Sequence, residues 1–358
     1  MKASLIWAYT QINLGDDLFI KILTERYPNQ SFSILGTKSK MLPFKGIKNL
    51  KVIKTELGRF DSLLKKIGLN IGLYDRKINK LAQQHDLTIN IGGSIFIESP
   101  EWKKNLEIYS RVIHNSKRFV ILGSNFGPFV SDSYYQQYLE TFKDASDICF
   151  RETTSYDLFQ EIPTVRKAPD IVFNLNIDRV EDYTETDYVL VSVMNLAVKK
   201  SLKQYKDIYE ENIVSLCQDF IGKGQKVKLM SFCKSEGDEV AIERIMEKIS
   251  SPLLTSYYYK GDMDGALSVI KSSKSVIATR FHSMILAFVF NKPVYPIIYS
   301  DKTLNVLNDV DFTGNYSHVG ELIDLKVLNE QLNFEERNHI TLESQNQFAY
   351  LDTILGDN

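Results

Sequence analysis

Short apolar runs recur along this chain, each ending at a glycine, asparagine or polar turn, and most are followed by longer amphipathic sequence. This rhythm predicts strands that alternate with helices, an order typical of a parallel sheet. The predicted strands form two series. The first comprises residues 4–8, 31–35, 87–91, 118–122 and 147–150, and the second comprises residues 188–193, 226–231, 253–258, 275–278 and 294–298. We therefore predict an α/β protein with two Rossmann-like, doubly wound domains.

An acidic segment that is poor in large apolar residues, 176–187, separates the two series and predicts a domain boundary. We assign residues 1–178 to an N-terminal domain, residues 179–187 to a linker and residues 188–328 to a C-terminal domain. Residues 329–358 are mostly polar with scattered apolar side chains. They predict a C-terminal helical segment that packs back on the N-terminal domain.

Composition narrows the range of partners. The 358 residues carry a formal net charge of −2, which provides no basic field for binding a nucleic acid, so we expect no such partner. The cysteines Cys149, Cys217 and Cys233 are odd in number and widely spaced, which favours reduced thiols and a cytoplasmic location. No stretch resembles a signal peptide or a membrane-spanning segment. Peripheral contact with the inner face of a membrane is compatible with this composition.

Three turns of small residues at predicted strand ends are candidates for ligand binding. Asn13, Gly15 and Asp16 lie between the first strand and helical sequence, so backbone N–H groups and a carboxylate meet at a helix start. As an N-cap alone, Asp16 needs no ligand. The other two turns, after the next strands, contain Gly92, Gly93, Ser94 and Asn125. Carboxyl ends of parallel strands share one edge of a sheet, so we expect these turns along the edge where ligands bind.

Arg151 follows the predicted strand at residues 147–150, and its guanidinium suits a carboxylate or a phosphate. A salt bridge to Glu152 or Asp157 is the alternative interpretation for this side chain. Asp170 lies ahead of an apolar run, where it either orients Arg151 or caps a turn.

Arg280 and His282 stand two residues apart, just after the predicted strand at residues 275–278. This spacing places a fixed cation beside a side chain that gains and loses a proton near neutral pH. Lys302 follows the next predicted strand, so two cations from neighbouring turns predict an anion site. A structural role for His282 and a plain surface charge for Lys302 are the alternatives.

The order of these motifs over residues 13–302 resembles the polysaccharide pyruvyl transferase family. The resemblance implies a GT-B-like fold, in which two Rossmann-like domains face a cleft that holds the active site. It implies catalytic roles for His282, Arg280 and Arg151. It also implies substrate binding, without a metal, by Asn13, Asp16, Gly92, Gly93, Ser94, Asn125, Asp170, Ser283 and Lys302.

The resemblance further implies transfer of the pyruvate group of phosphoenolpyruvate onto two saccharide hydroxyls, giving a cyclic ketal and phosphate without a cofactor. The carboxylate and phosphate of this donor require converging cations, for which Arg151, Arg280 and Lys302 are the candidates. His282 is the candidate acid that protonates the methylene carbon. The implied acceptor is a lipid-linked or nucleotide-linked precursor of a capsule, exopolysaccharide or cell-wall polymer.

Two positions depart from the family's pattern. The family commonly has a glycine-rich turn where this chain has Ser124-Asn125-Phe126, and an Arg-Asp pair where it has Arg151-Glu152. The longer Glu152 side chain is acceptable if it orients Arg151. Aromatic residues near the turns are candidates for stacking on sugar rings, namely Trp7, Tyr9, Phe96, Trp102 and Phe126, although burial is at least as compatible with Trp7.

Two other functions remain open at this point. A GT-B glycosyltransferase that uses a nucleotide sugar would share the fold and would also place cations against a diphosphate. A non-catalytic saccharide-binding member of a polysaccharide assembly complex is the second alternative. The spacing of Arg280 and His282, together with the Arg151 motif, favours the transferase that uses phosphoenolpyruvate.

Overall fold

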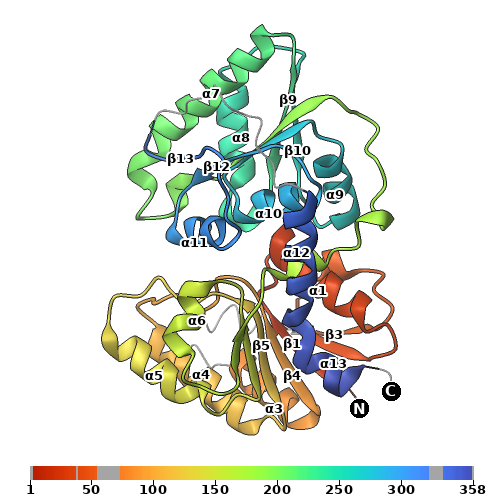
Figure 1. Cartoon of the computed structure of the whole chain (residues 1–358), viewed down its shortest axis with the longest axis vertical. Coiled ribbons are helices and arrows are strands. Elements are labelled where there is room, and N and C mark those ends of the chain that lie inside the picture. The colour runs from red at the N-terminus through yellow and green to blue at the C-terminus, as the bar shows by residue number, and fades with distance from the viewer. Residues whose placement is uncertain (1–2, 38, 55–72, 322–333, 357–358) are drawn as a thin grey trace. The chain divides into compact units, whose positions relative to one another are not determined.

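The computed structural model describes residues 3–37, 39–54, 73–321 and 334–356. Contacts divide the chain into two compact units, each with its own parallel sheet (Figure 1). Unit 1 comprises Met1–Thr10, Phe19–Ile171 and Gln345–Asn358, and unit 2 comprises Gln11–Leu18 and Val172–Ser344. Every helix within the described ranges is too short or too polar to cross a membrane.

The sheet of unit 1 has the order β3-β2-β1-β4-β5-β6-β7, and its neighbouring strands run parallel. The order reverses between β1 and β4, which is the switch point where α/β folds bind ligands beyond the strand ends. Its strands are β1 (Ser4–Ala8), β2 (Phe32–Gly36), β3 (Leu50–Lys54), β4 (Leu87–Ile91), β5 (Phe119–Ser124), β6 (Asp147–Phe150) and β7 (Val165–Lys167).

One face of this sheet is covered by a cluster rich in aromatic side chains. Alternate strand residues such as Phe119 and Ile121 point into this cluster, because side chains alternate between the two faces of a strand. Phe96, Trp102 and Phe126 are buried in it, so the prediction that these three stack on sugar rings is wrong. The helices that supply the cluster are α3 (Leu73–Gln84), α4 (Trp102–Asn115), α5 (Asp132–Phe142) and α6 (Thr153–Phe159).

The sheet of unit 2 has the order β10-β9-β8-β11-β12-β13, again with parallel neighbours. Its strands are β8 (Tyr188–Ser192), β9 (Lys226–Ser231), β10 (Leu254–Tyr258), β11 (Ser275–Ala278), β12 (Val294–Ile298) and β13 (Ser317–His318). Here the order reverses between β8 and β11. The helices that follow these strands are α7 (Lys206–Gly222), α8 (Asp238–Met246), α9 (Met263–Lys271), α10 (Phe281–Val289) and α11 (Asp301–Asp309).

The ten predicted strands all correspond to observed strands, and the prediction of two Rossmann-like α/β halves is confirmed. Three strands were missed: β3, β7 and β13. Each of them is the edge strand of its sheet, and β7 and β13 contain only three and two residues. None of the side chains of β3 is fully buried, so its sequence has no strong apolar periodicity to detect.

The polar segment expected to be a linker is attached to unit 2. The Lys271 ammonium donates to the Val180 carbonyl at 2.6 Å, and the Tyr183 N–H donates to the Ser272 hydroxyl at 2.8 Å. Lys228, which is buried, pairs with Glu185 at 2.7 Å. Because of such contacts, the change of unit falls between Ile171 and Val172, upstream of the expected boundary at 179–187.

The C-terminal segment is divided between the units. Helix α12 (Phe334–Ser344) belongs to unit 2, where the Asn174 amide donates to the Ser344 carbonyl at 3.0 Å. The turn η7 (Gln345–Phe348) and helix α13 (Ala349–Leu355) belong to unit 1. There the buried Gln347 amide accepts from the Gly123 N–H at 3.0 Å and donates to the Ala168 carbonyl at 2.7 Å. Residues 329–333 of the predicted segment lie outside the described residues.

Candidate functional site

The first turn of α10, at the switch point of unit 2, is held by serine hydroxyls. Ser192, the last residue of β8, accepts hydrogen bonds from the N–H groups of Thr279 and Arg280 at 3.0 and 3.1 Å. The buried Ser283 hydroxyl lies 2.6 Å from that of Ser192 and donates to the Arg280 carbonyl at 2.6 Å. The structure therefore places Ser283 behind the turn, where it fixes the backbone that carries Arg280.

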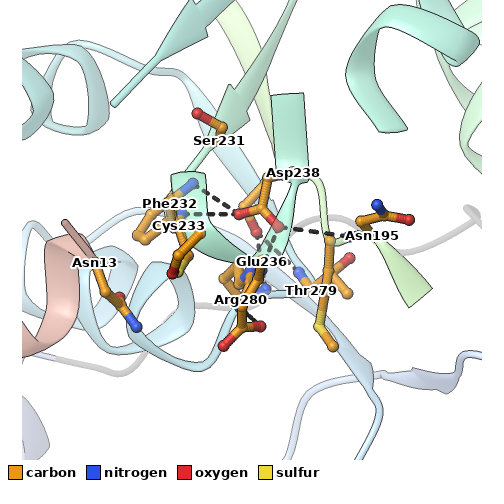
Figure 2. Close-up of polar contacts among 12 residues, drawn as sticks. Asn13, Asn195, Ser231, Phe232, Cys233, Glu236, Asp238, Thr279 and Arg280 are labelled. Carbon is orange, nitrogen blue, oxygen red and sulfur yellow. Dashed lines mark hydrogen bonds and ion pairs between the residues drawn. The ribbon is translucent and has the colours of Figure 1, made fainter. Parts of the chain in front are cut away.

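Two carboxylates contact the Arg280 guanidinium, whose residue is only 7% exposed. Nη1 donates to Glu236 Oε2 at 2.7 Å, and Nη2 donates to Asp238 Oδ1. Asp238 also accepts three backbone N–H bonds: from Phe232 at 3.0 Å, from Cys233 at 2.9 Å and from Asn195 at 3.4 Å. Figure 2 shows this carboxylate at the centre of the group. Asp238 thus joins the turns that follow β8 and β9 to the arginine that follows β11.

The charges within this group shift one another's pKa values. Burial lowers the pKa of Arg280, but the charges of Asp238 and Glu236 outweigh this effect and raise it above its ordinary value. Burial raises the pKa of Glu236, yet the nearby Arg280 and Lys199 lower it to about 2. Glu236 is therefore ionised at neutral pH, and Arg280 is a permanent cation.

Two lysines extend the positive charge beyond Arg280. Lys199 pairs with Glu236 at 3.4 Å, and its ammonium lies 5.3 Å from the centre of the Tyr299 ring. The Lys302 ammonium lies 5.3 Å from the same ring and 5.6 Å from the Phe281 ring. Burial raises the pKa of Tyr299, but the positive charges of Lys302, Lys199 and Arg280 outweigh it and leave that pKa below its usual value. The structure thus places Lys199 and the predicted Lys302 against one aromatic ring, and the predicted Arg280 is close enough for its charge to affect the same tyrosine.

The turn that begins α1 (Leu14–Arg26) lies against His282 within unit 2. The Leu14 N–H donates to the Phe232 carbonyl at 3.0 Å, and Asn13 forms an antiparallel bridge with Cys233. A Cβ atom placed on Gly15 would lie 1.8 Å from the Nδ1 atom of His282. The absence of a side chain at Gly15 therefore allows the imidazole to pack directly on the helix backbone. The half-buried Asp16 lies in this same turn, so the structure brings Asn13, Asp16 and His282 into one unit.

The next residue, Asp17, is fully buried and accepts a hydrogen bond from the Tyr259 hydroxyl at 2.8 Å. Burial raises the pKa of Asp17 well above its ordinary value, although the Tyr259 hydrogen bond opposes this shift. The contact ties the first turn of α1 to the end of β10.

Unit 1 contains a second group of predicted residues, at the carboxyl ends of β4, β5 and β6. The buried Arg151 donates through Nη1 to Asp170 at 2.9 Å and through Nη2 to the Asn125 amide oxygen at 2.8 Å. The Ser94 hydroxyl donates to the same Asn125 oxygen at 2.9 Å. A Cβ on Gly93 would lie 2.9 Å from Arg151 Nη1, so the absence of a side chain at Gly93 leaves room for the guanidinium. Asp170 orients Arg151, one of the two roles considered for it.

The second departure from the family's pattern, Glu152, caps a helix. Its carboxylate accepts from the Ser155 N–H at 2.9 Å and from the Ser155 hydroxyl, at the N-terminus of α6. The same Ser155 hydroxyl accepts from the Phe126 N–H at 2.7 Å and so supports the turn that carries Asn125. Ser124, in turn, donates to the Gly92 carbonyl at 2.7 Å, which joins the turns after β4 and β5.

Four residues of this site were not predicted, because their roles depend on strands that are distant in the chain: Asp238, Glu236, Asn195 and Lys199. One local signal was present: Gly237 has φ +72°, a conformation that favours glycine, directly before the helix start at Asp238. The described residues contain no group of three His, Cys, Asp or Glu side chains arranged to hold a metal ion.

Several solved structures share this fold at low sequence identity. HepE from Anabaena, in complex with UDP and glucose, is 11% identical, with a TM-score of 0.54. The match covers 99% of this chain and 97% of HepE. UGT73P12 from Glycyrrhiza uralensis, complexed with glycyrrhetinic acid 3-O-monoglucuronide, is 8% identical, with a TM-score of 0.56. The match covers 99% of this chain and 96% of UGT73P12. UDP-GlcNAc 2-epimerase from Methanocaldococcus jannaschii is 13% identical, with a TM-score of 0.55. The match covers 96% of this chain and 92% of the epimerase. These similarities show a two-domain, Rossmann-like GT-B fold.

A family model described as polysaccharide pyruvyl transferase matches residues 13–301. The match begins at the Asn13 turn and ends one residue before Lys302, so it includes every predicted site residue except Lys302. No curated protein matches the sequence.

Proposed function

The chain belongs to the polysaccharide pyruvyl transferase family, and we propose that it transfers the pyruvate group of phosphoenolpyruvate onto two hydroxyls of a saccharide. The observation that carries this proposal is the first turn of α10. There the Arg280 guanidinium and the His282 imidazole stand two residues apart. Lys199 contacts the same Glu236 oxygen as Arg280, and Lys302 lies over the ring of the intervening Phe281. A small donor with two anionic groups needs the cations, and a reaction that moves protons needs the imidazole.

The proposed reaction moves two protons. The methylene carbon of phosphoenolpyruvate takes one proton, and C2 then accepts the first hydroxyl oxygen, which loses its own proton. The C2–O bond to phosphate breaks, the second hydroxyl oxygen bonds to C2, and its proton balances the released phosphate. The product is a cyclic ketal with a new methyl group. We assign the proton donor at the methylene carbon to His282, which can accept a hydroxyl proton afterwards.

In this proposal, the cations of unit 2 bind the anionic groups of the donor. Arg280 offers a planar guanidinium, and Lys302 and Lys199 offer ammonium groups beside the Tyr299 ring. Arg151 is proposed as a substrate-binding residue of unit 1, held in place by Asp170 and Asn125. We propose a saccharide precursor of a polysaccharide, lipid-linked or nucleotide-linked, as the acceptor. The three buried, unpaired cysteines agree with a cytoplasmic setting.

Isothermal titration with phosphoenolpyruvate, beside a panel of nucleotide sugars and with or without magnesium, tests this proposal. We expect saturable binding of phosphoenolpyruvate and a Kd about tenfold higher in Lys302→Met, which loses one charge-assisted contact. The matched control is Lys274→Met, because Lys274 is an exposed lysine of unit 2 whose ammonium lies 3.8 Å from Asp187. Binding of a nucleotide sugar in place of phosphoenolpyruvate would move the assignment to glycosyl transfer.

Gly15→Ala is expected to lower turnover roughly 10²-fold, since a displacement of about 1 Å at a reacting group has that effect. The new Cβ would overlap the His282 ring and push it out of position. Alanine is a better helix former than glycine, so the fold should persist. Steady-state kinetics and circular dichroism measure the two effects.

Gly222→Ala is the matched control, because a Cβ at Gly222, the last residue of α7, meets nothing within 4 Å. It should show wild-type turnover. Unchanged turnover in Gly15→Ala would mean that the position of His282 does not depend on Gly15.

A further inference from the structure

The two carboxylates that contact Arg280 are held very differently. Asp238 is fully buried and accepts backbone N–H bonds from Phe232, Cys233 and Asn195, so its position is fixed by the fold. Glu236 is the last residue of the short turn η6 (Lys234–Glu236), and its side chain is 27% exposed. Among the described residues, the partners of its carboxylate are two cations, Arg280 and Lys199.

One oxygen atom of Glu236 serves both cations. Oε2 lies 2.7 Å from Arg280 Nη1 and 3.4 Å from Lys199 Nζ. Lys199 also shares the Tyr299 ring with Lys302, since each ammonium lies 5.3 Å from the ring centre. An incoming phosphate or carboxylate that binds Arg280 and Lys199 would need the position of this oxygen.

We propose that Glu236 occupies the position of an anionic group of the donor, and that the donor must displace this carboxylate from Arg280 and Lys199 in order to bind. Asp238 keeps its contact with Arg280 throughout and orients the guanidinium. The inference rests on the proposed function for the identity of the donor. It adds Glu236 to the site, as a carboxylate that competes with the donor for Arg280 and Lys199.

Protonation does not relieve this competition. Arg280 and Lys199 hold the pKa of Glu236 at about 2 against the opposing effect of burial, so the carboxylate stays charged at the pH of any activity assay. Displacement therefore exchanges one anion for another on the same cations. A doubly charged group has the advantage in this exchange over a singly charged one, which favours a phosphate over a carboxylate at this position.

The test is a titration of Glu236→Gln and Glu236→Ala with phosphoenolpyruvate and with inorganic phosphate. Glutamine keeps the size of the side chain but removes its charge, and we expect both anions to bind about tenfold tighter than to the wild type. The gain should shrink at high salt, which screens the cations. Lys199→Met should instead weaken the binding of both anions.

Glu243→Gln is the matched control, since it removes the same charge from an exposed position on α8. It should leave affinity unchanged. Weaker or unaltered binding in both Glu236 variants would overturn the inference and make Glu236 a positioning residue like Asp238. Thermal unfolding of each variant shows whether the fold is retained.

The two proposals fail in different ways. If phosphoenolpyruvate does not bind but inorganic phosphate or a nucleotide sugar binds tighter to Glu236→Gln, the donor is wrong and the competing role of Glu236 is supported. If phosphoenolpyruvate binds the wild type and Glu236→Gln equally, the donor is supported and the competing role is wrong. If no anion binds to any variant, both are wrong.

Discussion

His282→Ala is expected to lower the turnover number of pyruvyl transfer by roughly 10²–10⁴-fold, the usual contribution of a positioned acid or base. The imidazole packs on the backbone of Gly15 and makes an edge contact with the Phe281 ring, at 5.1 Å between ring centres. Arg280 and both lysines remain in the variant, so the Kd of phosphoenolpyruvate should change little. Single-turnover kinetics, with titration of the donor, separate the two quantities.

A histidine outside the site provides the control for this experiment. His339 lies on α12 with an exposed side chain, 3.6 Å from Glu343. His339→Ala should therefore retain wild-type turnover. Wild-type turnover in His282→Ala would remove His282 from the mechanism, and loss of donor binding in that variant would make it a binding residue.

Asp238→Ala is expected to lower the free energy of unfolding by about 3–5 kcal/mol, the usual effect of removing one member of a buried ion pair. The Arg280 guanidinium would lose its fully buried partner, and the N–H groups of Phe232 and Cys233 would lose their acceptor. Denaturant titration, followed by tryptophan fluorescence or circular dichroism, measures the change.

Asp219→Ala is the control for stability, because Asp219 is an exposed residue of α7. It should unfold like the wild type. If Asp238→Ala were equally stable, the carboxylate could not be the element that joins the turns after β8, β9 and β11. Asp238→Asn, which keeps the shape of the side chain, separates loss of charge from loss of packing.

The interior strands could be predicted because burial on both faces leaves a mark in local sequence. The five residues of β4 are all buried, as are those of β8, and both appear as short apolar runs. The edge strand β3 has no such mark, since all of its residues are partly exposed. The positions of Arg280 and His282 at a strand end could also be predicted from local sequence. Both residues follow closely after an apolar run, and that short stretch is enough to place them.

The unit to which the first turn of α1 belongs could not be predicted from local sequence. The sequence indicated a helix start with Asn13 and Asp16, but residues 11–18 belong to unit 2 whereas the rest of the helix belongs to unit 1. The bridge between Asn13 and Cys233, and the packing of Gly15 on His282, depend on residues more than two hundred positions away. The domain boundaries drawn from composition could not include such a crossing.

The sequence by itself determined the α/β class, the two sheets and the residues that carry charge and protons at the strand ends, because each of these depends on a few adjacent residues. Only the tertiary structure decided which side chains hold those residues. Glu236 and Asp238 come from the turn after β9 and contact Arg280, whereas Lys199 comes from the turn after β8 and pairs with Glu236; the strand order β9-β8-β11 brings these turns together. That order, set by packing across the whole sheet, has no signature in any one stretch of chain.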